Sequence, residues 1–143
     1  MERVDVVYAL ILDENEEKIL MVKNIKHDDW TMPGGAVEKG EILSEAVVRE
    51  AKEETGLTIE AGDILSVNEA FMEKYNHHAI FFTFMAKVIS GEISIQDTET
   101  IADTAWVSIE EADKRMPYHK EGIRNLLEKA VPYVFQGRVI EKV

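Results

Sequence analysis

Three glutamates in one short stretch of the chain have the type and spacing needed to bind a metal ion. Glu50, Glu53 and Glu54 stand at positions i, i+3 and i+4, and side chains at this spacing share one face of an α-helix. Like charges on one face repel each other, and a helix that only faced solvent would alternate Glu with Lys. Carboxylates are the oxygen ligands that Mg²⁺ prefers, and a bound Mg²⁺ also binds substrate phosphates. The pattern therefore predicts a magnesium site for a phosphate-bearing ligand.

The net charge of the chain makes such a cation necessary. The formal net charge is −12 over 143 residues, and a field of this sign repels DNA, RNA and phosphorylated metabolites at long range. We therefore expect no DNA binding and no non-specific binding of nucleic acid. A small phosphate-bearing ligand requires a cationic mediator, and the predicted metal provides it.

Composition and length indicate one soluble domain, which we expect to span residues 1–143. The apolar fraction of 45 % and charged fraction of 31 % are typical of globular proteins. The absence of cysteine excludes disulfides, thiolate metal sites and cysteine nucleophiles. The longest early apolar run, Val6 to Leu12, is too short to span a bilayer, and no cleavage site follows it. We expect a cytoplasmic protein without membrane association.

The elements that precede the glutamates follow from the hydrophobic pattern. Val4 to Leu12 is a near-continuous apolar run, which predicts a strand buried on both faces. Ile19 to Lys23 predicts its hairpin partner. Trp30 to Met32 is expected to be extended because a proline follows it. Pro33-Gly34-Gly35 predicts a turn.

A helix is expected to carry the glutamates. Ser44 is predicted to cap its first turn, the helix is predicted to run to about Thr55, and Gly56 stands where a glycine commonly ends a helix. The apolar side chains that adjoin the acidic face on the helical wheel are expected to face the core; they are Val47, Val48, Ala51 and Thr55 with its methyl group.

Strands and helices alternate irregularly after this helix. The pattern predicts strands at Ile64 to Lys74, His78 to Ile89, Glu92 to Ile95 and Ala105 to Ser108, a polar loop at Asp97 to Thr104, and helices at Glu110 to Arg115 and Glu121 to Tyr133. This order is typical of an α/β domain in which a mixed sheet carries helices on its faces.

The stretch from Gly35 to Leu57 resembles the Nudix box, the signature of the Nudix hydrolase family, which includes MutT-like proteins. The box reads G-x5-E-x7-R-E-U-x-E-E-x-G-U, where U is a bulky aliphatic residue. Glu41 and Arg49 occupy its first acidic and its basic position, and every other fixed position also matches. The one departure is Ala51, which is smaller than the usual aliphatic residue.

The resemblance implies an α/β/α sandwich in which the box forms a loop, a helix and a second loop. It implies hydrolysis of a nucleoside diphosphate linked to another group, with Mg²⁺ or Mn²⁺ as the cofactor. Glu50, Glu53 and Glu54 match the metal-binding glutamates of the family. Gly34 matches a glycine whose carbonyl often completes the metal site. Among these, Glu50 is our first choice for the base that accepts a proton from the attacking water.

Two further box residues carry family roles. Arg49 matches the arginine that pairs with a box glutamate and orients the helix. Glu41 matches a glutamate that binds metal in some members and is structural in others. Some members also use an acid from a late loop. Thr100 occupies that position here, with Glu99 one residue earlier, so Glu99 and, next, Asp97 are the candidates for this role.

Three residues outside the box are candidate substrate contacts, each with a plainer alternative. Lys23 contacts a phosphate or is solvated, Trp30 stacks on a base or packs at the edge of the core, and Tyr75 contacts substrate or is a partly buried turn residue. The position of Tyr75 after the box resembles that of dinucleoside polyphosphate hydrolases. His119 reaches the rim of the substrate site or, as the plainer alternative that we favour, lies at a solvated helix entry.

The function indicated is a divalent-metal-dependent pyrophosphohydrolase that acts on a small nucleoside diphosphate derivative. The alternatives within the family are a dinucleoside polyphosphate, ADP-ribose or an RNA 5′ end, of which the net charge disfavours RNA. A different class, the non-catalytic nucleotide-sensing module, usually carries a degraded box, whereas all three glutamates are present here. Family members are often homodimers, and the sequence leaves the oligomeric state open.

Overall fold

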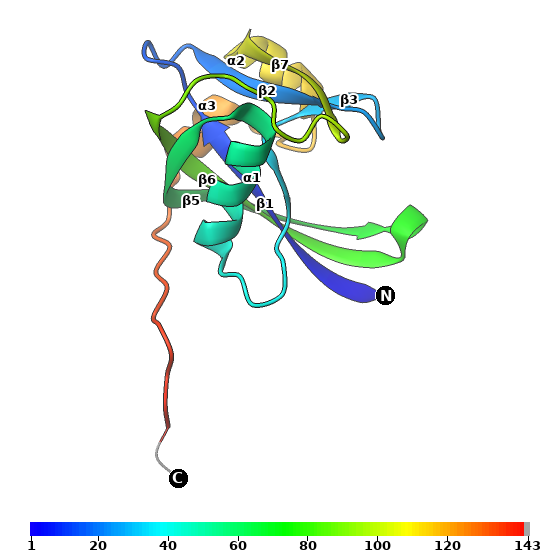
Figure 1. Cartoon of the computed structure of the whole chain (residues 1–143), viewed down its shortest axis with the longest axis vertical. Helices are drawn as coiled ribbons and strands as arrows, with labels where there is room; N and C mark the ends of the chain where they lie inside the picture. Colours follow the sequence, from blue (N-terminus) through cyan, green and yellow to red (C-terminus); the bar gives the residue numbers. More distant parts are fainter. Residues whose placement is uncertain (142–143) are drawn as a thin grey trace.

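The computed structural model describes residues 1–141 and arranges the chain in two β-sheets (Figure 1). The first sheet has the strand order β4-β1-β6-β5 and the second has the order β3-β2-β7. The strands are β1 (Glu2–Ile11), β2 (Lys18–Asn24), β3 (Asp29–Thr31), β4 (Gly34–Ala36), β5 (Thr58–Met72), β6 (His77–Ser90) and β7 (Ile101–Ser108). Because β1 runs parallel to β6 and antiparallel to β4, the first sheet is mixed, and the predicted α/β class is confirmed.

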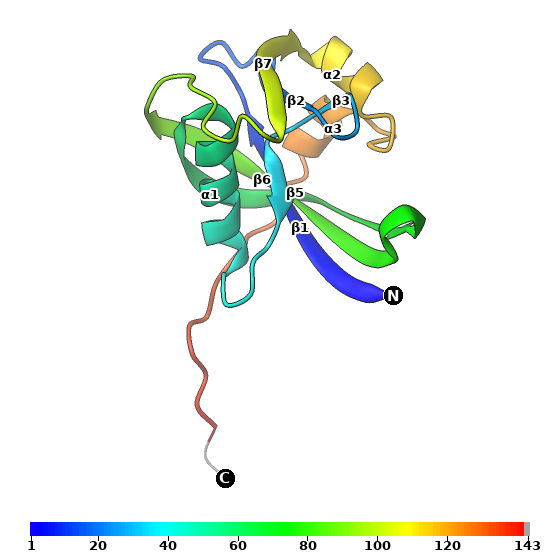
Figure 2. The ribbon, with the colours of Figure 1, turned by 45° about the vertical axis from the view of Figure 1, so that its right-hand side comes forward.

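Helices cover the sheets from two sides (Figure 2). Helix α1 (Leu43–Thr55) lies on one side of the strands, and α2 (Ile109–Arg115) and α3 (Ile123–Leu127) lie on the other. A short 3₁₀ turn, η1 (Glu73–Tyr75), closes the long β5–β6 hairpin. No helix among residues 1–141 combines the length and the hydropathy required to cross a bilayer.

Strand β1 is the centre of the fold because its side chains contribute to two cores. Val7, Ala9 and Ile11 belong to a buried cluster that includes the apolar side of α1, whereas Leu10 belongs to a second cluster with residues of α2 and α3. Successive side chains of a strand point to opposite faces. The near-continuous apolar run therefore reflects burial on both faces, as predicted. Full burial begins at Val7, because the first residues of β1 are exposed or half-buried.

The predicted hairpin between the first two strands is wrong. Strands β1 and β2 share a single bridge, from Leu12 to Ile19, and then enter different sheets. Both edges of β1 are already paired, one with β4 and the other with β6 over the whole strand. Strand β2 pairs instead with β3 and β7. Periodicity predicts that each strand exists but not which distant strand it pairs with.

Helix α1 ends as predicted but begins differently. Its N-cap residue is Ile42, which makes no side-chain capping bond, so Ser44 lies inside the helix and the predicted cap is wrong. The entry loop is fixed by other contacts, among them a hydrogen bond from the Glu38 N–H to Glu41 Oε1 at 3.0 Å. At the other end, Gly56 adopts φ 81°, the left-handed conformation expected of a glycine that ends a helix.

Four smaller predictions also fail. Gly34 and Gly35 form the short strand β4 rather than a turn. The segment 92–95 is not a strand, and the predicted loop at 97–104 contains the first residues of β7. The helix predicted from Glu121 to Tyr133 is limited to α3. Beyond it the chain is extended, because the Val131 and Ile64 backbones exchange two hydrogen bonds of 2.9 Å.

Gly56→Ala should destabilise the fold. A Cβ at position 56 would lie 2.6 Å from the carbonyl oxygens of Glu92 and Ser94, and it would force a non-glycine residue into positive φ. We expect a loss of about 1–3 kcal/mol in the free energy of unfolding, measured by urea denaturation. Gly40→Ala is the matched control, since Gly40 also has positive φ but a Cβ there would meet no atom within 4 Å. Equal losses in the two variants would show that the contact with the 92–94 segment is unimportant.

Candidate metal centre

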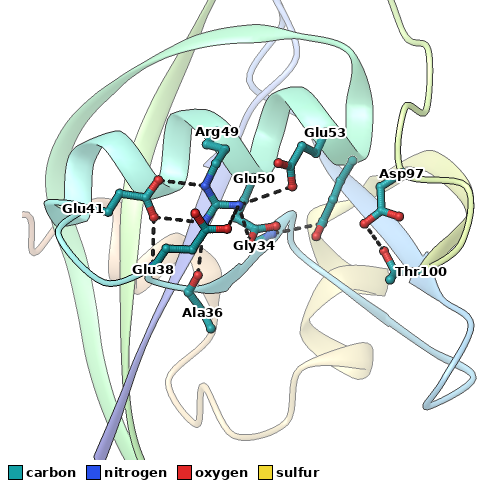
Figure 3. A network of polar contacts seen from close by, with 10 residues as sticks. Gly34, Ala36, Glu38, Glu41, Arg49, Glu50, Glu53, Asp97 and Thr100 are labelled. Carbon is teal, nitrogen blue, oxygen red and sulfur yellow. Dashed lines mark hydrogen bonds and ion pairs between the residues drawn. The ribbon is translucent and has the colours of Figure 1, made fainter.

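Helix α1 presents its glutamates beside the face that it packs against the first sheet. Val47, Ala51 and Thr55 are buried, as the helical wheel predicts, whereas the predicted Val48 is only partly buried against the same core and Ala46 is buried in addition. Glu50 and Glu53 project from the adjoining face, and Figure 3 shows them with their polar contacts. Glu54 reaches β4, where its carboxyl accepts a hydrogen bond from the Gly34 N–H. Packing of the apolar side therefore fixes where the acidic side lies.

Arg49 connects the entry loop to the acidic face (Figure 3). Its guanidinium binds Glu41 through two parallel hydrogen bonds, from Nε to Oε2 at 2.7 Å and from Nη2 to Oε1 at 3.0 Å. Nη1 also donates to Glu50 Oε1 at 3.0 Å and to Glu53 Oε2 at 3.3 Å. The hydrogen bonds from Arg49 lower the pKa of Glu41. In this geometry Glu41 holds Arg49 in place, which is the structural one of its two predicted roles.

Glu50 and Glu54 form a close pair of carboxyl groups in a dry environment. Glu54 is only 6 % exposed, and its Oε1 accepts a hydrogen bond of 3.1 Å from the Gly34 N–H. Burial, followed by the negative charge of Glu50, raises the pKa of Glu54 to about 9. Burial also raises the pKa of Glu50, although the bonds from Glu54 and Arg49 oppose this rise. Near neutral pH, Glu54 is therefore protonated and donates a hydrogen bond to Glu50.

Gly34 and Gly35 allow this pair to lie against the sheet. A Cβ on Gly35 would lie 2.6 Å from Glu50 Oε1, and one on Gly34 would lie 2.0 Å from the carbonyl oxygen of Val7. Any larger residue at either position would displace the carboxyl or the strand. Gly34 was expected to offer its carbonyl to a metal; the contact seen here is a different one, from its N–H to Glu54.

The donor chemistry of this cluster fits a hard divalent cation. All donors are oxygens, and the carboxyl groups of Glu50 and Glu54 lie close together with raised pKa values, so a divalent cation beside them would favour the ionisation of both. Within residues 1–141, no three acidic or histidine side chains stand at metal-binding distances in this conformation. Glu53 is instead turned to Arg49 and its side chain is 42 % exposed.

The loop before β7 brings Asp97, rather than Glu99, to the end of α1. The backbone N–H groups of Gln96 and Asp97 both donate to the Glu53 carbonyl, at 3.0 and 2.9 Å. The charge of Asp97 contributes to the raised pKa of Glu54. Glu99 is exposed. Asp97 therefore replaces Glu99 as the candidate late-loop acid, and counting residues along the sequence did not distinguish the two.

Two of the three candidate substrate contacts are neighbours, because Lys23 and Trp30 pair across β2 and β3, and the Tyr75 hydroxyl lies 3.3 Å from Nε2 of His27 in the loop between these strands. Lys23 Nζ makes a surface ion pair of 3.5 Å with Asp28. Trp30 is half-buried against the second core, with the Arg115 guanidinium 4.9 Å from its ring centre, which favours the packing role. Tyr75 lies in η1 at the tip of the β5–β6 hairpin, which projects away from α1 in Figures 1 and 2.

A cavity next to this cluster was not predicted from the sequence. The cavity has a volume of about 320 Å³, and its walls include Tyr8, Asn68, Tyr118 and His119. Tyr8 joins the cavity to the cluster, because it pairs with Gly34 across β1 and β4. His119 is only 8 % exposed, so the predicted solvated position is wrong. These residues come from distant segments of the chain. Tyr8 lies within an apolar strand, and nothing in its local sequence indicates that it lines a cavity.

A wider depression of about 930 Å³ lies elsewhere, around the loop between β1 and β2. Its lining includes Asp13, Glu14, Glu16 and Glu60, and Lys87 is its only basic residue. Acidic walls without a glutamate of α1 offer nothing to a phosphate group. The smaller cavity at Tyr8 is therefore the candidate for the organic part of a phosphate-bearing ligand.

Comparison with known proteins identifies relatives over most of the chain. The NUDIX domain family profile matches residues 2–129. An ADP-ribose pyrophosphatase of Methanocaldococcus jannaschii is 40 % identical over 59 % of this chain and 52 % of its own length. The 8-oxo-dGDP phosphatase NUDT18 of Homo sapiens is 32 % identical over 93 % of this chain and 40 % of its own length. The chain thus spans about half or less of these two relatives.

A solved structure has the same fold. The NUDIX hydrolase from Nitrosomonas europaea superposes with a TM-score of 0.80, covering 96 % of this chain and all of the other at 23 % identity. At this identity the likeness concerns the fold alone.

Arg49→Lys should destabilise the fold because a lysine cannot make the paired hydrogen bonds to Glu41. These side chains are 23 % and 14 % exposed, so we expect a loss of about 1–3 kcal/mol in the free energy of unfolding, measured by urea denaturation. Arg124→Lys is the control, since Arg124 and its partner Glu110 are 66 % and 70 % exposed, and it should change stability by less than about 0.5 kcal/mol. A similar small change in both variants would contradict the structural role of Arg49.

Glu54→Gln should flatten the pH dependence of stability of the metal-free protein. The pKa of Glu54 is about 9 in the folded chain, above the ordinary value of 4.5. The stabilisation from its neutral form is therefore complete below the ordinary pKa and is lost as the pH rises through the folded pKa. Thermal midpoints in EDTA from pH 7 to about 9 should fall more in the wild type than in Glu54→Gln.

Glu45→Gln serves as the control for this measurement, because Glu45 lies on the same helix but is exposed. It should keep the wild-type pH dependence. Parallel curves for the wild type and Glu54→Gln would show that Glu54 is already ionised at pH 7.

Proposed function

The chain belongs to the Nudix hydrolase family, and from this premise we propose that it hydrolyses the diphosphate linkage of a nucleoside diphosphate derivative by attack of water at phosphorus. The observation that carries the proposal is the close Glu50–Glu54 pair beside Glu53, in which burial raises the pKa of both carboxyl groups. The repulsion between two carboxyl groups held close together makes the metal-free state less favourable, and a bound divalent cation would relieve that repulsion. The relatives named above are an ADP-ribose pyrophosphatase and an 8-oxo-dGDP phosphatase.

The proposed cofactor is Mg²⁺ or Mn²⁺, held by Glu50, Glu53, Glu54 and the Gly34 carbonyl. When bound, such a cation neutralises charge on the diphosphate and lowers the pKa of a water ligand. Oxygen-only donors suit these hard cations. The acidic chain, with a net charge of −12, would otherwise repel its own substrate.

Each side chain of the cluster contributes in a different way. Glu50 is proposed as the base that accepts a proton from water, because burial raises its pKa and so makes it a stronger base than a surface carboxylate. Glu54 is held in place by the hydrogen bond that its Oε1 accepts from the Gly34 N–H. Arg49 is a positioning residue that ties the helix to the entry loop through Glu41.

The substrate is proposed to place its nucleoside part in the cavity at Tyr8 and its diphosphate against the glutamates. The strand pairing of Tyr8 with Gly34 makes the two regions neighbours. A volume of about 320 Å³ is near the lower limit of ligand sites, about 300 Å³, and suits one nucleoside rather than two. A mononucleoside derivative is therefore preferred to a dinucleoside polyphosphate, and the negative net charge argues against an RNA end.

Glu53→Gln should abolish most of the activity. We would measure phosphate and nucleoside monophosphate release from a panel of nucleoside di- and triphosphates, nucleotide sugars and dinucleoside polyphosphates, with Mg²⁺ or Mn²⁺. The variant should lose about 100-fold or more in kcat/KM, the scale on which one charge-stabilising group contributes. Glu53 is partly exposed, so the loss should not come from unfolding.

Glu45→Gln is the matched control for this panel, being the same substitution at an exposed position of the same helix. It should keep wild-type activity. If the wild type bound nucleotides but hydrolysed none of the panel with either metal, the hydrolase proposal would be replaced by that of a nucleotide-sensing module.

A further inference from the structure

The cavity at Tyr8 has aromatic walls. The rings of Tyr8 and Phe81, on neighbouring strands of the first sheet, are nearly parallel, with an interplanar angle of 13° and centroids 6.2 Å apart. Tyr118 contributes a third ring from the segment between α2 and α3. Flat apolar walls with few polar groups are typical of sites for a planar ring.

Asn68 supplies a polar group at this cavity that has no partner within the protein. Its Oδ1 is buried and accepts no hydrogen bond within the described part of the chain. Three other buried side-chain atoms share this state, Ser66 Oγ, Arg115 Nη1 and Asn125 Oδ1, but none of these residues lines the cavity. An unpaired buried acceptor is unfavourable, and among the four only that of Asn68 can be paired by a ligand in the cavity.

The other acidic groups of the cavity make this polar edge rich in acceptors. Asp29 lines the cavity from β3, where its Oδ1 already accepts a hydrogen bond of 3.1 Å from Asn24. Glu69 lines it from β5, where its Oε2 pairs with His78 Nε2 at 2.7 Å. A ligand edge that carries a hydrogen-bond donor is favoured in such surroundings, and an edge that carries another acceptor is disfavoured.

The side chain of Asn68 can present its oxygen to a ligand. The torsion that turns a side-chain amide is broad and roughly two-fold, so either end of the amide can face the cavity. The oxygen is the end that gains most from turning, because inside the protein it is buried without a partner.

We propose that Asn68 determines base specificity by accepting a hydrogen bond from a ring N–H of the nucleobase. The preferred ligands are bases with a lactam N–H, such as guanine, hypoxanthine and uracil. Adenine and cytosine are disfavoured, because the corresponding ring nitrogen is an acceptor. This inference rests on the proposed function for its choice of a nucleoside as ligand, but binding of the base requires no metal and no hydrolysis.

The test compares inosine with 1-methylinosine, in which a methyl group replaces the ring N–H. Dissociation constants are measured by titration calorimetry in EDTA, so that no diphosphate chemistry takes part. The wild type should bind inosine about 10-fold more tightly than 1-methylinosine, which is the effect of one hydrogen bond to a buried group. In Asn68→Leu this ratio should fall to about one, because the variant offers no acceptor.

Asn125→Leu is the matched control. It removes a buried amide oxygen that is equally without a partner, but from α3 and not from the cavity. It should keep the wild-type ratio. Thermal unfolding of both variants reports folding separately, and Asn68→Leu should unfold no lower than the wild type, since an unpaired polar atom has been removed.

Two results would overturn the inference. The wild type could bind the two nucleosides equally or bind neither, or Asn68→Leu could stay folded and keep the wild-type ratio. Either can occur while metal-dependent hydrolysis of the nucleotide panel is intact, in which case only the role of Asn68 is lost. Conversely, a ratio that depends on Asn68 without hydrolysis of any nucleotide would support the base site and reject the hydrolase.

Discussion

The repulsion between Glu50 and Glu54 is the constraint on which the arrangement of the site depends. Two buried carboxyl groups in contact cannot both be ionised, and the fold holds them together by means that have little to do with charge. The apolar side of α1 packs on the first sheet, the Gly34 N–H binds Glu54, and the absence of a side chain at Gly35 leaves room for Glu50. Packing free energy therefore offsets the repulsion, and a bound cation would remove it.

Arg49 reduces the repulsion among the glutamates from the surface side of the cluster. One guanidinium contacts Glu41 by two hydrogen bonds and also reaches Glu50 and Glu53. It makes two hydrogen bonds to Glu41, of 2.7 and 3.0 Å, but only one each to Glu50 and Glu53, so its position is set mainly by the entry loop. The result is a fixed positive charge at the edge of the glutamates, which limits their repulsion and leaves the Glu50–Glu54 pair in contact. An exposed lysine would provide charge without this fixed position.

Local features of the sequence predicted the local structure, and contacts between distant segments escaped it. The i, i+3, i+4 spacing was sufficient to place three glutamates on one face, and Gly56 was sufficient to end the helix. The pairing of β1 with β6 rather than β2 depends on contacts across the whole chain, which hydrophobic periodicity does not report. The same limit explains why Asp97 was ranked behind Glu99, since two backbone hydrogen bonds to Glu53 decide which of them reaches the helix. It also explains why Asn68 was not predicted as a site residue, because the unpaired state of its buried amide oxygen is visible only in the folded structure.

The alternation of side chains along β1 links the two halves of the proposed site. Val7, Ala9 and Ile11 pack beneath α1, so Tyr8 must point to the opposite face of the strand, where the cavity lies. The register of β1 with β4 then sets Tyr8 opposite Gly34, whose N–H binds Glu54. A shift of one residue in this register would exchange the faces and move the aromatic wall away from the glutamates. The register that builds the two cores therefore also fixes the distance between the proposed metal-binding face and the proposed base-binding cavity.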